Sequence, residues 1–300
     1  MLKIAYHPTF CLNLPEGHRF PMAKYELLPQ QLLYEGTVNV ENFFEPSIDA
    51  RKWILQTHAE DYVHRLENGQ LSKAEIRRSG FPWSREMVDR EFLLAAGTIE
   101  ATQFAMRQGV AMNIAGGTHH AYADKGEGFC LLNDQAIAAN YLLDQHALKK
   151  ILILDLDVHQ GNGTAEIFAK QDRVYTFSMH GAKNYPMKKE ASDWDIGCPD
   201  GMNDEEYLAV LQDALAVLMK EVSPEFIFFQ SGVDVLATDK LGRLSLTIEG
   251  CKRRDQLVIE WAKNNNVPMT ICMGGGYSEK IADIVNAHAN TYRLVQSTYF

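Results

Sequence analysis

The amino-acid sequence predicts an α/β fold of three layers, in which helices cover both faces of a mostly parallel central sheet. Short apolar runs typical of buried strands alternate with amphipathic stretches of helical length, which is characteristic of parallel sheets with crossover helices. No repeat, low-complexity tract or flexible linker interrupts this pattern, so we expect a single domain over residues 1–300. The hydrophobic content of 46% is sufficient for a sizeable core.

The individual elements follow from the same patterns. Residues 2–6 are typical of a short strand, residues 7–23 of a loop, and residues 47–67 of a mostly helical region. A long helix is expected to begin after Ser84, a good N-cap residue, and to end near Gln108. Beyond it, strands are expected at 110–115, 150–158, 174–179, 226–230 and 267–273, and helices at 133–145, 163–169, 204–222, 248–264 and 279–293.

The composition limits the classes of function. The formal net charge of −10 argues against direct binding to nucleic acid, because phosphate backbones would be repelled. The same charge favours cationic substrates such as lysine side chains or polyamines, although a need for solubility alone would also explain it. The five cysteines are widely spaced and form no C-x-x-C pair, which disfavours disulfides or a thiolate zinc site and agrees with a cytoplasmic location. We expect neither a signal peptide nor a membrane span.

The strongest chemical signal lies at the end of the strand expected at 150–158. Side chains alternate between the two faces of a strand, so Asp155, Asp157 and His159 share one face. Two carboxylates and an imidazole at the end of an apolar strand would be poorly stabilised without a cation. They are suitable ligands for zinc, iron(II) or manganese. A strand end that merely reaches solvent is the less favoured alternative.

Two other strand ends carry groups that suit acid–base and electrostatic catalysis. His119 and His120 follow a pair of glycines, and a neutral imidazole can take a proton from water and return it to a leaving amine. Tyr277 follows three glycines, and its hydroxyl can donate a hydrogen bond to a developing oxyanion.

Asp234 follows a fourth apolar strand. A single aspartate in this position commonly caps a helix or forms a turn. It becomes a third metal ligand only if its strand lies beside the strand that carries Asp157. Because the carboxyl ends of parallel strands share one edge of the sheet, the four strand ends together would supply a metal, a base and an oxyanion donor. These are the groups needed to hydrolyse an amide.

These motifs resemble those of the histone deacetylase superfamily, which has the arginase/deacetylase fold. Their order and spacing fit that family, and the DVHQGNG run and the compact length most resemble its class IV branch and the bacterial histone-deacetylase-like amidohydrolases. Looser matches are EGHRFP at 16–21 and TH at 57–58. The clear matches are GGTHHA at 116–121, GFC at 128–130 with ND at 133–134, DLDVHQGNG at 155–163, SGVD at 231–234 and GGGY at 274–277.

The resemblance implies a zinc-dependent amidohydrolase that removes acetyl or longer acyl groups from lysine side chains, with residues 1–300 as one catalytic domain. Asp157, His159 and Asp234 would bind a single zinc ion, and the same ligands would also accept iron(II). The substrate would be an acyl-lysine protein or another acetylated amine.

The resemblance also implies roles in catalysis. His120 would act with the metal to activate water, and His120 or its neighbour His119 would protonate the leaving amine. His119 would assist electrostatically, oriented by Asp155, and Tyr277 would stabilise the oxyanion.

Further residues would shape the channel and bind potassium. Phe129 would form one wall of the channel for the aliphatic stem and Tyr185 the other, with Gly128 and Gly275 beside them. The residues that match the family's inner structural potassium site are Asp155, Asp157, His159, Ser178 and Met179.

One position departs from part of the family. Class I members have an aspartate behind the second histidine of the pair, whereas this sequence has Asn162, as other branches do. An amide cannot stabilise a charged imidazole as a carboxylate would, so we expect a less elevated pKa for His120.

Three alternatives remain at this point. An arginase-like ureohydrolase with two manganese ions is disfavoured, because Gly232 stands where a further carboxylate would be needed. A deacetylase of acetylpolyamines or other small molecules would use the same core motifs, with specificity set by loops at 7–23, 70–84 and 181–202. A non-catalytic module that binds acyl-lysine is a remote alternative, because every matched catalytic position is intact.

Overall fold

Eight strands form one sheet in the order β2-β1-β3-β8-β7-β4-β5-β6, and every neighbouring pair is parallel. The computed structural model describes residues 1–300 and confirms the predicted α/β fold, with a sheet that is parallel throughout. The strands are β1 (Ile4–Ala5), β2 (Phe43–Phe44), β3 (Val110–Asn113), β4 (Ile151–Asp155), β5 (Val174–Gly181), β6 (Trp194–Cys198), β7 (Phe226–Gln230) and β8 (Met269–Cys272).

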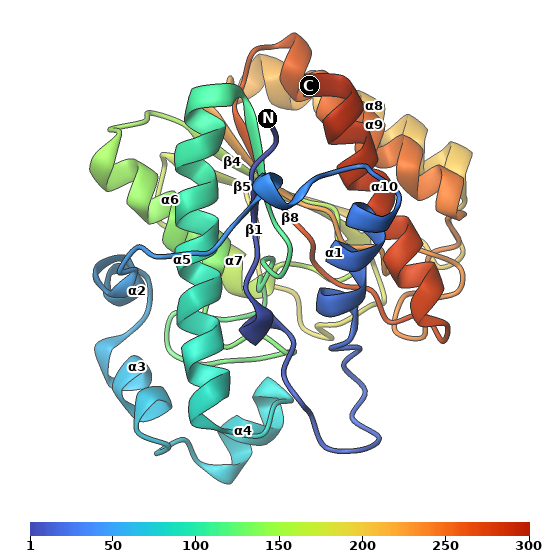
Figure 1. The fold of residues 1–300 in the computed structure, drawn as a ribbon. Coiled ribbons are helices and arrows are strands. Elements are labelled where there is room, and N and C mark those ends of the chain that lie inside the picture. Colours follow the sequence, from blue (N-terminus) through green and yellow to red (C-terminus); the bar gives the residue numbers. More distant parts are fainter.

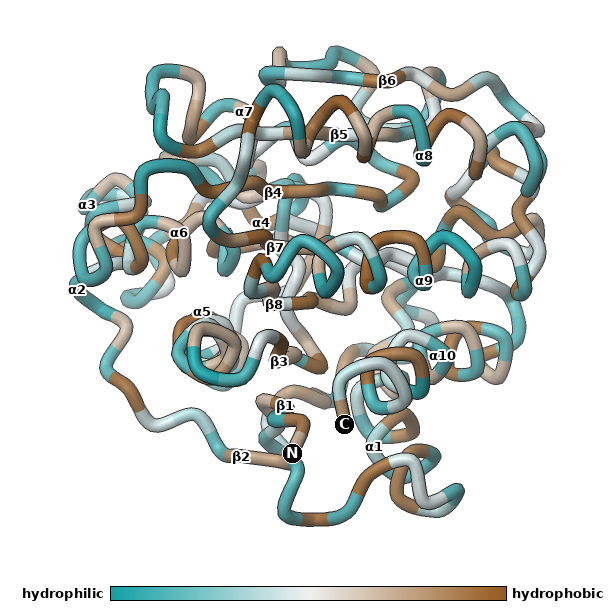
Figure 2. The backbone as a smooth tube through the Cα atoms, turned by 90° about the horizontal axis from the view of Figure 1, so that it is seen from above, coloured by the Kyte–Doolittle hydropathy of each residue, from teal (hydrophilic) through white to brown (hydrophobic).

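Helices cover both faces of this sheet (Figures 1 and 2). One face carries α1, α8, α9 and α10, and the other carries α5 and α6, with α2 packed on α6. No helix combines the length and the apolar character needed to cross a membrane. The helices are α1 (Lys24–Tyr34), α2 (Arg51–Thr57), α3 (Glu60–Glu67), α4 (Lys73–Ser79), α5 (Arg85–Gln108), α6 (Asp134–Gln145), α7 (Asn162–Phe168), α8 (Asp204–Glu221), α9 (Ile248–Asn264) and α10 (Ile281–Tyr299), with short 3-10 helices at Pro8–Phe10 and Val40–Asn42.

The long helix α5 begins where the sequence predicts. The Ser84 side chain accepts a hydrogen bond from the backbone N–H of Met87 at 3.1 Å, which satisfies one of the free donors of the first turn. Of the expected helices, α10 differs most in length, because it continues to Tyr299 instead of ending near 293.

The three segments expected as specificity loops contain regular structure, so that expectation is wrong in part. Residues 7–23 include a 3-10 helix, and residues 70–84 include α4, which a reciprocal capping box between Ser72 and Glu75 starts. Residues 181–202 include the edge strand β6, which pairs with β5. The elements α1 and β2 were not expected. Hydrogen bonds to β1 form β2, and packing on α10 stabilises α1. Such tertiary contacts leave no strong pattern in the local sequence.

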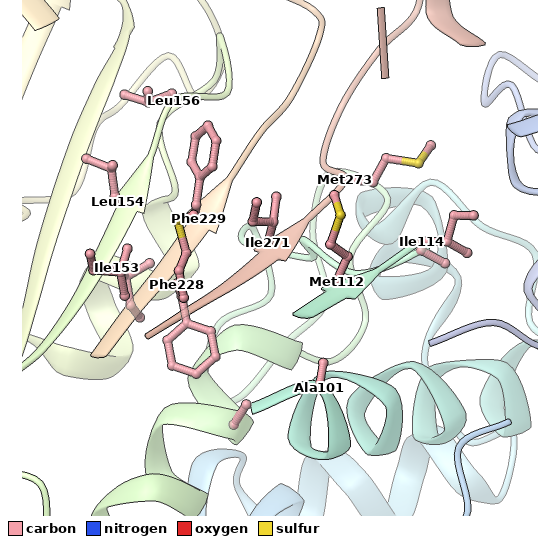
Figure 3. Packing of buried hydrophobic residues seen from close by; sticks show 14 of the residues in the cluster. Ala101, Met112, Ile114, Ile153, Leu154, Leu156, Phe228, Phe229, Ile271 and Met273 are labelled. Carbon is pink, nitrogen blue, oxygen red and sulfur yellow. The ribbon is translucent and has the colours of Figure 1, made fainter. Parts of the chain in front are cut away.

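The core is a continuous cluster of 79 buried residues. In β7 all five residues are buried, because helices cover the sheet on both faces. Phe228 and Phe229 point to opposite faces, and Phe228 points toward α5, where Ala101 lies (Figure 3). The central strands are therefore held by apolar packing from both sides.

The register of the central strands places their carboxyl ends in one row. Asp155 lies opposite Gln230, Gln230 opposite Cys272, and Cys272 opposite Asn113. The four loops that follow these strands therefore leave the same edge of the sheet next to one another. These loops carry the three candidate metal ligands, the histidine pair and Tyr277.

Replacing Phe228 by alanine should lower the free energy of unfolding by about 3–5 kcal/mol, because the removed ring leaves a cavity between the sheet and α5. Chemical denaturation followed by circular dichroism measures the change. Phe300→Ala is the matched control, since this side chain is 45% exposed at the chain end. Equal losses in the two variants would contradict the packing described here.

Candidate active site

Asp157, His159 and Asp234 converge at the carboxyl edge of the sheet. All three are buried, and one ligand atom from each lies within 4.8 Å of the others. The His159 Nδ1 atom is 3.1 Å from Asp157 Oδ1 and 3.2 Å from Asp234 Oδ2. Asp234 reaches this cluster because β7 lies directly beside β4, which is the condition that the sequence set.

Backbone amides orient the two carboxylates. The N–H of Gly275 donates to Asp157 Oδ2 at 2.8 Å, and the N–H of Val158 donates to Asp234 Oδ1 at 2.9 Å. A Cβ atom at position 275 would lie 2.0 Å from Asp234 Oδ2, so only glycine permits this approach. One oxygen of each carboxylate is thus fixed and the other faces the cluster.

The donor set of the cluster fits one divalent cation. Burial and the neighbouring Asp157 carboxylate raise the pKa of Asp234 to about 7. Burial alone would lower the pKa of His159, but the same two carboxylates raise it to about 10. Both shifts reflect negative charges that a cation between them would stabilise. Two carboxylate oxygens and one imidazole nitrogen suit zinc or iron(II).

Gly232 lies against this cluster. A Cβ atom built at position 232 would lie only 2.3 Å from Asp157 Oδ2. A carboxylate side chain at this position, which a second metal ion would require, does not fit the observed arrangement. The geometry therefore agrees with the sequence argument against a ureohydrolase with two metal ions.

The two adjacent histidines stand beside the cluster, each with its own buried partner. The Nδ1–H of His119 donates to Asp155 Oδ2 at 2.6 Å, and the Nδ1–H of His120 donates to Asn162 Oδ1 at 2.6 Å. The loop that carries them is fixed by the carboxylate of Asp134, which accepts from the backbone N–H of residues 117 and 118. These hydrogen bonds leave Nε2 of each ring free for chemistry.

The partners give the two imidazoles opposite character. Burial would lower the pKa of His119, but the carboxylates of Asp155 and Asp157 raise it to about 9. Burial, followed by the nearby rings of His119 and His159, lowers the pKa of His120 well below its usual range. His119 is therefore the cationic member of the pair and His120 the neutral one.

Tyr277 faces the cluster from the loop after β8. Burial and the carboxylates of Asp157 and Asp234 raise the pKa of its hydroxyl well above the usual range, so the hydroxyl keeps its proton and remains a donor. Its ring packs against Phe129, with the ring centres 6.0 Å apart. Phe129 adopts a φ of 65°, and its N–H is held by the Ser79 carbonyl at 2.7 Å.

Tyr185 forms another part of the wall. Its ring meets that of His120 edge to face, with the centres 5.1 Å apart, and its hydroxyl donates to Glu127 Oε1. Glu127 Oε1 also accepts from the side-chain amide of Asn162 at 3.2 Å. Tyr185 is thus connected to His120 through Glu127 and Asn162.

Two cavities meet at the cluster. The inner cavity has a volume of about 30 Å³ and is lined by Asp157, His119 and aromatic side chains such as Tyr25. The outer cavity has a volume of about 290 Å³ and is more open. Both are lined by His120, Gly128, Phe129, His159 and Tyr277, whereas Gly275 lines the inner one and Tyr185 the outer one. The reactive groups therefore lie where a small cavity meets a larger one.

The comparisons with known proteins agree with this arrangement. The family model for the histone deacetylase domain matches residues 18–292. The chain belongs to the histone deacetylase family. An uncharacterized protein of Picosynechococcus is 41% identical over 296 residues, which cover 99% of each chain.

Two further members of the histone deacetylase family illustrate the range of similarity. Histone deacetylase 2 of Arabidopsis thaliana is 29% identical over 284 residues, which cover 91% of this chain and 73% of that protein. The crystal structure of a histone deacetylase homologue from Aquifex aeolicus superposes with a TM-score of 0.84 at 24% identity, over 98% of this chain and 84% of that one. The latter shows a shared fold. The class IV assignment stays a prediction, because these names do not separate the branches.

The positions expected to bind potassium lie around Asp155. This residue pairs in register with Ser178 of β5, and Met179 follows it in the same strand. The Ser178 hydroxyl is 2.9 Å from Nδ1 of His180. A potassium site here remains a prediction.

Lys24 is a buried cation near the site that sequence reasoning missed. Lys24, at the start of α1, is fully buried, and its ammonium group donates to the Gly274 carbonyl at 3.0 Å. It lies over the rings of Phe20, Tyr25 and Tyr277. Burial lowers its pKa to about 8. The resemblance at EGHRFP ends at Pro21, three residues before Lys24, and the sequence did not predict helix α1. No pattern therefore marked this lysine as buried.

Exchanging Asp234 for asparagine should weaken the binding of zinc about 100-fold, because one anionic ligand is lost from the cluster. Isothermal titration of the metal-free protein with zinc measures the affinity and the stoichiometry, which should be one ion per chain. Asp213→Asn, an exposed change on α8, is the control and should bind as the unaltered protein does. Undiminished binding by Asp234→Asn would contradict the proposed ligand set.

Proposed function

We propose that this protein is a metal-dependent amidohydrolase that removes acetyl groups from lysine side chains, with residues 1–300 as one catalytic domain that acts in the cytoplasm. The observation that carries the proposal is the position of the Asp157–His159–Asp234 cluster. It lies at the junction of the two cavities, together with a neutral and a cationic imidazole and a phenol. Membership of the histone deacetylase family supports the same reaction class.

The two cavities suggest how the substrate lies. A lysine attached to a protein must leave through the wider mouth, so the acyl group must enter the inner cavity. The inner volume of about 30 Å³ corresponds to about two water molecules. This space suits an acetyl group and is too small for a long acyl chain, which favours acetyl-lysine within the range of acyl groups considered.

The residues would divide the chemistry among them. A zinc or iron(II) ion held by Asp157, His159 and Asp234 would polarise the amide carbonyl and acidify a water molecule. His120, neutral and with Nε2 free, would accept the proton of that water as it attacks and pass it to the leaving amine.

The neighbouring groups would stabilise the charge that develops. His119 carries positive charge because Asp155 accepts from its Nδ1–H, and this charge would favour an anionic transition state. Tyr277 would donate its hydroxyl proton in a hydrogen bond to the oxyanion. Phe129 and Tyr185 would enclose the aliphatic stem of the lysine.

The acyl preference gives a direct test of this function. We expect the zinc-loaded protein to hydrolyse an acetyl-lysine peptide at least about 100-fold better, in kcat/KM, than the octanoyl and myristoyl peptides, because steric exclusion from the inner cavity removes transition-state binding. Tyr277→Phe should lower kcat for the acetyl peptide about 100-fold. Mass spectrometry of the products measures both. Equal rates across the chain lengths would contradict the acetyl preference, and no hydrolysis of any acyl-lysine would contradict the function.

The pH dependence tests the role of His120. Its pKa is depressed, so the neutral base persists to low pH and the acid limb of kcat/KM should lie below the usual histidine range. In Asn162→Asp a carboxylate would face Nδ1 at the 2.6 Å contact and stabilise the imidazolium, so the pKa should rise and the acid limb should move to higher pH.

Rate profiles between about pH 5 and 9 measure this shift. Asn13→Asp, an exposed change outside the site, is the control for altered net charge. An acid limb that stays in place in Asn162→Asp would exclude His120 as the base.

A further inference from the structure

Three arginines line the outer cavity. Arg19 comes from the loop before α1, and Arg77 and Arg78 come from the last turn of α4. They share this cavity with His120 and Tyr277, which lie beside the cluster of Asp157, His159 and Asp234. We call these three residues the arginine cluster. The mouth of the site is therefore positively charged, although the chain as a whole has a net charge of −10.

None of the three arginines forms an ion pair with a carboxylate. Other surface arginines of this chain do so, for example Arg51 with Glu67 and Arg65 with Glu75. All three arginines of the cluster are exposed, and all three line the outer cavity. In a chain with 39 acidic and 29 basic residues, three neighbouring unpaired guanidinium groups are a specific feature of this surface.

The backbone that carries the arginines is attached to the channel wall. The carbonyl of Arg78 accepts from the N–H of Gly128 at 3.2 Å, directly before Phe129. The Nε2–H of His18 donates to the Gly80 carbonyl at 2.9 Å, which joins the loop of Arg19 to the end of α4. The cluster is thus placed relative to the reacting groups by the same contacts that place the wall.

A purely structural role explains only part of the cluster. Positive residues in the last turn of a helix interact favourably with its dipole, and this applies to Arg77 and Arg78. It does not apply to Arg19, which lies outside any helix and reaches the same cavity.

Glu127, which precedes Gly128 of the channel wall, does not neutralise the arginine cluster. Glu127 Oε1 accepts from the hydroxyl of Tyr185 and from the amide of Asn162, and Glu127 forms no ion pair with an arginine. The guanidinium groups therefore remain available for an anion. Arginine binds carboxylates through two parallel hydrogen bonds, and this geometry favours them over neutral groups.

We propose that the arginine cluster binds a carboxylate carried by the amine part of the substrate. The preferred substrate is then an acetyl-lysine with acidic neighbours in a peptide, or one with a free α-carboxylate. This inference rests on the proposed function, in which the amine part of the substrate extends through the mouth. It also disfavours acetylpolyamines, because their remaining ammonium groups would be repelled.

The test compares matched substrates of the zinc-loaded protein. We expect kcat/KM to be highest for an acetyl-lysine peptide flanked by aspartate and glutamate. It should be lower for one flanked by asparagine and glutamine, and lowest for one flanked by lysine. We expect about a tenfold advantage of the acidic over the neutral peptide, mainly in KM, which shrinks at high salt as exposed charges are screened. Free Nε-acetyl-lysine and its α-amide form a second pair, which distinguishes a small-molecule source of the carboxylate from a protein source.

The triple variant Arg19→Gln, Arg77→Gln, Arg78→Gln should bring kcat/KM for the acidic peptide down to that of the neutral one. Lys73→Gln removes a charge from the same helix outside the cavity and should keep the preference. Equal rates for the charged and neutral members of both pairs, or a preference that persists in the triple variant, would overturn the inference.

The neutral peptide separates this inference from the function itself. Its hydrolysis by the unaltered protein tests the deacetylase proposal without the arginine cluster. If no substrate reacts, that proposal fails, and calorimetric binding of the acidic and neutral peptides still supports or overturns the carboxylate preference.

Discussion

Hydrogen bonds between the parallel strands β3, β8, β7 and β4 hold their carboxyl ends in one row, and the chemistry of the molecule depends on this register. The pairing of Asp155 with Gln230 brings Asp234 to the loop that carries Asp157 and His159. A shift by one residue would turn every side chain of the shifted strand to the other face and separate these groups. Apolar packing on both faces of β7 fixes the strands, so the core determines the site.

The same register creates a concentration of buried charge. Asp155, Asp157 and Asp234 are all buried, and buried carboxylates without compensating charge are costly. Part of the compensation comes from backbone N–H groups and from His119. A divalent cation bound as proposed would supply the rest, and metal binding would then be coupled to the stability of this edge of the sheet.

The outer parts of the site depend on contacts between segments distant in sequence. The end of α4 is hydrogen-bonded to Gly128 and Phe129, so one short helix holds an aromatic wall and presents two arginines. The net charge of −10 alone favours cationic substrates, whereas the positively charged mouth favours anionic ones. Local charge at the entrance, held close to the reacting groups, outweighs distant charges that are screened by solvent.

The central strands and the candidate ligands were predictable from the sequence for a physical reason. Strands buried on both faces are continuous apolar runs, and polar residues directly after them, such as Asp157 and Asp234, stand out against that background. The edge strand β6 and the helices α1 and α4 lack such contrast, because tertiary packing and capping determine them. The arginine cluster was not predictable, because Arg19 and Arg77 are brought together only by the fold. Lys24 was missed for the same reason.

The central claim is that the register of the four strands brings the loops after them together to form one metal site. Anomalous diffraction from crystals grown with zinc, measured at the zinc absorption edge, tests it most directly. We predict a single strong peak within bonding distance of His159 Nδ1 and of one oxygen each from Asp157 and Asp234, at about 2.0–2.2 Å. Two peaks at this edge of the sheet, or a peak that none of these three residues contacts, would contradict the account.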